Sequence, residues 1–190
     1  MLGSLESSSS RRRPAEDHPD EPAATRQRRL NSFFQGLHLS LDCFGADASG
    51  NRSLNFHRMV NCKGFHDPQE DKSLRSHCGL HESTVAAILR HQQWQDTLSH
   101  VIDFLKRPGN RSGRINMGVY CARGRHRSVA VCFLLSEALQ RLGAQVHVSF
   151  TERQAGNWNR LCSTCRKCRS TPAKTANVDT VTEQILAMID

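Results

Sequence analysis

Residues 115–142 read INMGVYCARGRHRSVAVCFLLSEALQRL. Apolar side chains alternate with other residues at Ile115, Met117 and Val119, which predicts a β-strand. The basic segment 121–128 follows, and apolar residues at helical spacing come after it, so the stretch predicts strand, loop and helix. The first backbone N–H groups of a helix have no partner inside it and carry the positive end of its dipole, which suits a phosphate or carboxylate. The loop is therefore a candidate anion-binding site.

Positive charge gathers around this loop. Arg123, Arg125 and Arg127 lie within it, and residues 104–136 contain no Asp or Glu. Gly124 permits backbone conformations that other residues resist. We therefore expect a positive local field that attracts an anionic ligand. The alternative is an ordinary strand-to-helix turn whose arginines point into water.

The composition limits the class of protein. The chain has 190 residues and a formal net charge of +8, a length that suits one domain. The positive charge favours an acidic partner, either nucleic acid or a phosphorylated metabolite, without choosing between them. We expect an intracellular protein, cytoplasmic or nuclear and without a membrane partner, because the sequence shows no secretory signal and no apolar run of membrane-spanning length. The 8 cysteines of such a protein suggest reduced thiols or metal ligands rather than disulfides.

The sequence divides into three regions. Residues 1–33 form a basic, Ser-rich leader that is expected to be disordered, because it offers too little apolar surface to bury. Residues 37–151 form the folded domain. Residues 152–190 form a Cys-rich basic tail that ends in an amphipathic helix over 178–189, which we expect to pack on the core.

Strands and helices alternate within the domain. The patterns predict strands over 37–45, 57–64, 115–120 and around 146–148, and helices from residue 82 up to Pro108 and over 127–142. This order predicts an α/β fold: a single three-layer-type domain with a small βαβ sheet and helices on its faces. Ligands of such folds lie at the carboxyl ends of the strands, which is where the 121–128 loop is placed.

Four segments carry a family resemblance. They are GVYCARGRHRSV at 118–129, HLSLDCFG at 38–45, NCKGFHDP at 61–68 and LRSHCGL at 74–80. In their order along the chain they resemble the C-terminal domain of the RapZ family, also described as RNase adapter proteins, over residues 37–151. The resemblance implies an α/β domain that recognises RNA and an amino-sugar phosphate, glucosamine-6-phosphate. It also implies a regulatory adapter rather than an enzyme, with no required cofactor.

The resemblance also implies site residues. The anion loop contributes Cys121, Ala122, Arg123, Gly124, Arg125, His126, Arg127 and Ser128, and the weaker candidates are Asn61, Lys63, Asp67, Arg75 and Gly79. Family members usually have an acidic residue and an Arg where this chain has Asn61 and Lys63, and a Thr or small residue and a Gly at positions 122 and 123. These differences are expected to change which phosphate compound fits. The phosphate-cradling Gly-x-x-x-x-Gly-Lys-[Ser/Thr] sequence of full-length bacterial members does not occur in this chain.

The same loop supports an enzymatic alternative. Cys121, five residues and Arg127, followed by Ser128, resemble the phosphate loop of cysteine-dependent phosphatases. A helix N-terminus and arginines lower the pKa of a thiol, and the thiolate would attack phosphorus. That mechanism needs a general acid, and Asp96 and Asp103 fall in a regular helix pattern. We therefore expect a binding module, in which Cys121 packs under the loop.

The tail carries a second motif. Cys162, Cys165 and Cys168 are spaced so that their thiolates can share one zinc ion. A structural site generally needs a fourth ligand, which His147 or a distant Cys such as Cys132 would have to supply, and the sequence does not place either residue near the three cysteines. One alternative is a nucleic-acid-contacting tail with Trp158 among cations at 160, 166, 167 and 169. The other is a flexible basic connector.

Overall fold

The computed structural model describes residues 33–46, 55–110, 113–158, 161–162, 165–169 and 172–189. Nearly all of the predicted leader, residues 1–33, lies outside these ranges. Within the described residues one parallel sheet has the strand order β2-β3-β1-β4, and its strands are β1 (His38–Gly45), β2 (Arg58–Asn61), β3 (Arg114–Cys121) and β4 (Gln145–Phe150). The predicted α/β class is confirmed.

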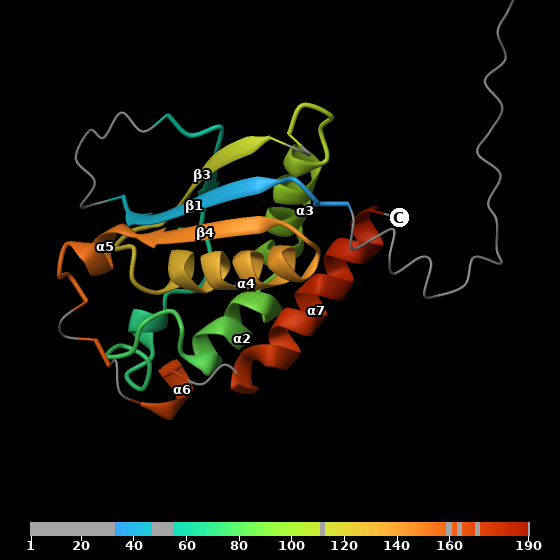
Figure 1. The fold of residues 1–190 in the computed structure, drawn as a ribbon. Coiled ribbons are helices and arrows are strands. Elements are labelled where there is room, and N and C mark those ends of the chain that lie inside the picture. Colours follow the sequence, from blue (N-terminus) through green and yellow to red (C-terminus); the bar gives the residue numbers. More distant parts are fainter. Residues whose placement is uncertain are drawn as a thin grey trace, which may run out of the picture.

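The two central strands bury alternate side chains. Leu39 and Leu41 of β1 are buried, and their register partners on β3 are Ile115 and Met117. This apolar side of the sheet packs on α4 (Arg127–Arg141), which has contacts with β1, β3 and β4. Figure 1 shows the resulting layers: the sheet, then α4, then α2 (Glu82–Arg90) and α7 (Pro172–Ile189). The core therefore lies between the sheet and these helices.

The helical region predicted from residue 82 is divided into α2 and α3 (Gln93–Leu105), and the prediction of one continuous helix is wrong. His91 has extended backbone angles, and its ring Nδ1 accepts a hydrogen bond from the Gln93 N–H at 3.2 Å. Since this local bond satisfies a donor at the start of a new helix, the chain turns there.

Strand β2 is shorter than the predicted 57–64 segment. The Asn61 side-chain oxygen accepts a hydrogen bond from the Lys63 N–H at 3.0 Å, which turns the chain directly after the strand. The remaining short elements are η1 (Pro68–Glu70), α5 (Thr151–Gln154) and α6 (Arg166–Arg169).

The terminal helix packs on the core, as predicted, and is longer than expected. Val178, Val181 and Ile185 of α7 are buried, and the helix has contacts with α2, α3 and α4. The Trp94 indole also donates a hydrogen bond of 2.8 Å to the Gln184 side chain. Burial of each such aliphatic side chain stabilises the fold by roughly 1.5–3 kcal/mol. Among the described helices, none combines the length and apolar character that crossing a bilayer requires.

Candidate anion-binding site

The loop between β3 and α4 lies against the carboxyl end of β1. Gly124 has a φ of +60°, and a Cβ added there would stand 2.4 Å from the Gly45 nitrogen and 2.5 Å from the Phe44 carbonyl carbon. The Ala46 N–H donates to the Cys121 carbonyl at 2.9 Å. A glycine is therefore required both by the backbone angle and by the close approach of the β1 backbone.

The loop also packs on the segment before α2. The Gly79 N–H donates to the Arg125 carbonyl at 2.8 Å, and a Cβ on Gly79 would stand 2.0 Å from the His126 carbonyl oxygen. Gly79, a weak candidate from the resemblance, is thus placed directly against the loop. Because glycine has no side chain, the segment before α2 can contact the backbone of the 121–128 loop.

Arg127 anchors a third segment. Its guanidinium donates to the carbonyl oxygens of Lys63 at 2.8 Å and Phe65 at 3.1 Å, and to the Asp67 carboxylate at 2.8 Å. The Arg127 side chain is 9% exposed and that of Asp67 is 31% exposed. Two of its nitrogens are therefore used inside the protein, and this arginine holds residues 63–67 against the loop.

Three consecutive residues each have a buried side-chain nitrogen that finds no hydrogen-bond partner among the described residues. These atoms are Arg125 Nε, His126 Nε2 and Arg127 Nε. Helix α4 begins beside them, and its N-cap residue, His126, makes no side-chain capping bond. Leaving a buried donor unsatisfied costs about 1–3 kcal/mol. The two guanidinium N–H groups among these atoms are donors that the acceptor oxygens of an anion could satisfy.

Burial lowers the pKa of His126 below its ordinary value. A hydrogen bond with the His77 backbone opposes this shift, as does Asp67, while the charges of Arg125 and Arg127 add to it. The ring is therefore neutral at pH 7, and the positive charge of the loop comes from its arginines.

The Cys121 thiol lies beneath the loop and is 2% exposed as a residue. Its sulfur is 3.2 Å from the Ser128 hydroxyl, which also accepts a hydrogen bond from the Cys43 thiol at 3.2 Å. Burial opposes ionisation of Cys121, but hydrogen bonds from the hydroxyl and N–H of Ser128, the charge of Arg127 and the Gly124 N–H together hold its pKa below the ordinary value. The thiol is thus buried and acidified.

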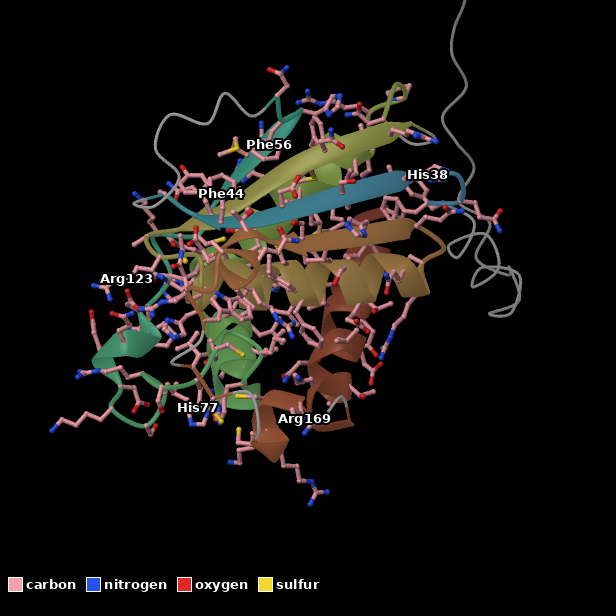
Figure 2. All side chains as sticks on the ribbon, turned by 60° about the vertical axis from the view of Figure 1, so that its left-hand side comes forward. His38, Phe44, Phe56, His77, Arg123 and Arg169 are labelled. Atoms are coloured by element: carbon pink, nitrogen blue, oxygen red, sulfur yellow. The ribbon has the colours of Figure 1, made fainter. Side chains whose placement is uncertain are left out.

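The other sequence candidates have different positions. Figure 2 shows Arg123 projecting outward, and this residue is exposed. Lys63 joins the site through its carbonyl oxygen, and Asn61, two residues earlier, is exposed at the end of β2. Arg75 is exposed and donates through Nε to the Gln69 carbonyl at 3.1 Å, within its own loop. Ala122 is partly buried.

Glu152 is a site residue that sequence reasoning missed. This 4% exposed side chain follows β4 and accepts a hydrogen bond from the Gly45 N–H at 3.2 Å, and its other oxygen accepts one from the Asn157 side chain. It fixes the end of β1 under Gly124. A carboxylate four residues after the predicted 146–148 strand of a parallel sheet was the available signal, since all such strands end at one edge.

The predicted metal ligands of the tail are brought together with a histidine. The ligand atoms of His77, Cys162, Cys165 and Cys168 all lie within 4.8 Å of one another. The fourth residue of the cluster is His77, and neither His147 nor Cys132 belongs to it. Cys132 is fully buried in α4, and His147 lines a hollow on the sheet with His38 and Arg114. His77 reaches the cluster because it forms an isolated parallel bridge with Cys162.

The aromatic residue of the tail packs internally. The Trp158 ring lies 5.4 Å from the Phe150 ring, measured between centroids, and the Arg153 guanidinium stands 5.9 Å from the Trp158 ring. Lys167, one of the tail cations, pairs with Glu82 at 2.9 Å. These contacts attach the tail to the folded domain.

Comparison with known proteins bears on the whole domain. The chain matches no curated protein. The family model of the RapZ C-terminal domain matches residues 37–154, which run from just before β1 to the end of α5 and contain the entire anion loop. Since this match covers more than half of the chain, the protein belongs to the RapZ C-terminal domain family.

Proposed function

We propose that this domain binds a phosphorylated small molecule at the 121–128 loop, with an amino-sugar phosphate such as glucosamine-6-phosphate as the expected class. The observation that carries the proposal is the pair of buried, unsatisfied Nε–H groups of Arg125 and Arg127 at the N-terminus of α4. Membership in the RapZ C-terminal family supports a binding and regulatory module. A phosphate group offers several acceptor oxygens and a negative charge, which match these donors and the helix dipole.

The charge balance of the site favours a ligand with both an anion and a cation. The loop carries three arginines, while Asp67 keeps about a third of its side chain exposed beside Arg127. A phosphate would lie against the donors, and Asp67 would face the ammonium group of an amino sugar. Glucosamine-6-phosphate is therefore expected to bind more tightly than glucose-6-phosphate, which lacks that ammonium.

The test is isothermal titration calorimetry of the full chain with glucosamine-6-phosphate, glucose-6-phosphate and inorganic phosphate. Arg125→Gln should weaken phosphosugar binding by tenfold or more, because a hydrogen bond to a charged group is worth about 1.5–3 kcal/mol. Arg123→Gln is the matched control: it removes the same charge from an exposed position of the same loop and should change affinity by less than about threefold. Absence of wild-type binding, or equal loss in both variants, would contradict the proposal.

RNA is the second acidic partner that the family suggests. The net charge of +8 and the exposed Arg123 within the loop favour contacts with a phosphate backbone. In this case affinity for RNA should fall steeply with salt, and Arg123→Gln should reduce the salt dependence. An RNA affinity insensitive to salt would exclude binding through these cations.

The lowered pKa of Cys121 favours the phosphatase as a second candidate. In that reaction the thiolate would attack phosphorus and release an alcohol protonated by a carboxyl group, and water would then cleave the thiophosphate. Asp67 lies nearer the loop than Asp96 or Asp103, which lie on α3. Two features disfavour this function: the thiol is buried, and Arg127 is bonded to the 63–67 segment.

The two candidates respond differently to Cys121→Ser. If the protein is a phosphatase, the wild-type chain should hydrolyse para-nitrophenyl phosphate and the Cys121→Ser variant should not. The binding module should show no turnover in either form and should retain the phosphosugar in both. We expect the second result.

A further inference from the structure

We propose that His77, Cys162, Cys165 and Cys168 bind one Zn²⁺ ion, and that this ion fastens the Cys-rich tail to the segment that supports the anion loop. All four ligand atoms lie within 4.8 Å of one another. Three thiolates with one imidazole form a typical structural zinc set. Figure 2 shows His77 and Arg169 of α6 on the side of the molecule away from the sheet, so this site is separate from the sheet surface.

The distances within the cluster fit a tetrahedral ion. The His77 Nδ1 atom is 3.3 Å from the Cys168 sulfur and 3.6 Å from the Cys165 sulfur. With Zn–S near 2.3 Å and Zn–N near 2.0 Å, tetrahedral angles place the ligand atoms roughly 3.5–3.8 Å apart. A disulfide between two of the cysteines would leave the third thiol and the histidine without a role.

The backbone around the cysteines supports thiolates. The Cys165 N–H points to the Cys162 sulfur and the Cys168 N–H to the Cys165 sulfur, each at 3.3 Å. Such N–H groups stabilise negative sulfur and orient it toward a metal. In both bonds the N–H of one cysteine meets the sulfur of the cysteine three residues before it.

A buried cation balances the charge of the cluster. Lys174 is 3% exposed, and its ammonium donates to the carbonyl oxygens of Cys168 and Leu80, each at 3.1 Å. Within the described residues it forms no ion pair with a carboxylate. Three thiolates and a neutral imidazole around Zn²⁺ carry a net charge of −1, which offsets a buried ammonium beside them.

The position of His77 connects the metal to the anion loop. The Cys162 N–H donates to the Ser76 carbonyl at 2.7 Å, so the tail is paired with the backbone beside His77. Two residues further along, Gly79 donates to the Arg125 carbonyl and lies against His126. The zinc site would therefore hold the tail against the 76–79 segment, which contacts the anion loop. This connecting role, unlike the metal site itself, rests on the proposed function.

The first experiment is elemental analysis of the full chain purified under reducing conditions, together with Co²⁺ substitution. We expect about one zinc per chain and, with Co²⁺, the thiolate charge-transfer and intense d–d absorption of tetrahedral sulfur ligation. Cys165→Ser and His77→Gln should reduce zinc content at least several-fold. The matched control His147→Gln removes an exposed histidine of β4 and should retain the metal. A wild-type chain without zinc or the cobalt spectrum, or equal loss in the control, would overturn the proposal.

The second experiment separates the metal from the ligand. Zinc is removed with a strong chelator, and hydrogen exchange is followed at the amides of residues 121–128 without phosphosugar. Exchange there should accelerate, while the central strands remain protected. Unchanged exchange in zinc-free protein would overturn the supporting role. Zinc content and exchange that behave as expected, with no binding of glucosamine-6-phosphate, would instead refute only the proposed function.

Discussion

Replacing Arg127 by alanine tests whether this arginine holds the fold around the site. The change removes two hydrogen bonds to the carbonyl oxygens of Lys63 and Phe65 and the ion pair with Asp67. If each of these three bonds from a charged donor contributes about 1.5 kcal/mol, their loss would lower the free energy of unfolding by more than about 4 kcal/mol. Because the Asp67 side chain is 31% exposed and is rehydrated in the variant, we expect a loss of about 2–4 kcal/mol.

The assay is urea unfolding followed by circular dichroism, with the free energy of unfolding compared between variants. Arg123→Ala is the control, since it removes an exposed arginine of the same loop and should change stability by less than about 0.5 kcal/mol. A loss below about 1 kcal/mol for Arg127→Ala would refute the anchoring role. The result also decides how ligand binding by Arg127→Ala is interpreted. If the 63–67 segment is displaced in this variant, binding is expected to weaken even where Arg127 itself does not contact the ligand.

Three further outcomes are expected. Gly124→Ala should cost at least about 2 kcal/mol in unfolding free energy, because a left-handed backbone and a close strand both oppose the methyl group, whereas Gly109→Ala, with open space around it, should be nearly neutral. Ser128→Ala should raise the pKa of Cys121, because it removes the hydroxyl that stabilises the thiolate; alkylation followed by peptide-resolved mass spectrometry should then show a higher midpoint pH than in wild type, and an unchanged midpoint would contradict this cause. Ile185→Ala should destabilise the domain by about 2–5 kcal/mol if α7 is part of the core, and unchanged thermal unfolding of this variant would contradict the packing of the helix.

The two arginines that flank His126 illustrate how tertiary structure assigns different roles to similar residues. Arg125 and Arg127 are equivalent candidates in the loop sequence. In the folded domain, the Arg127 side chain is bonded to the 63–67 segment, while the Arg125 backbone carbonyl accepts a hydrogen bond from the Gly79 N–H. Arg125 is therefore the better position at which to test ligand contact.

Local pattern alone determined the class of the fold and most of its elements. Alternating apolar residues placed the β3 strand, and helical spacing placed α4 within one residue of its observed end. The motif order identified the family, and the cysteine spacing marked three of the four clustered residues. These features could be predicted because periodicity, turn residues and short spacings act along the chain, between residues that are near in sequence.

Only the tertiary structure decided which distant segments meet at the carboxyl edge of the sheet. The strand order brings residues 63–67 to Arg127 and Glu152 to Gly45, and the pairing of His77 with Cys162 replaces the expected histidine of β4. The division of the long helix at His91 also depends on one side-chain hydrogen bond that no periodicity reveals. The physical reason is that these contacts join residues tens of positions apart, and their partners are selected by packing of the whole domain rather than by local propensity.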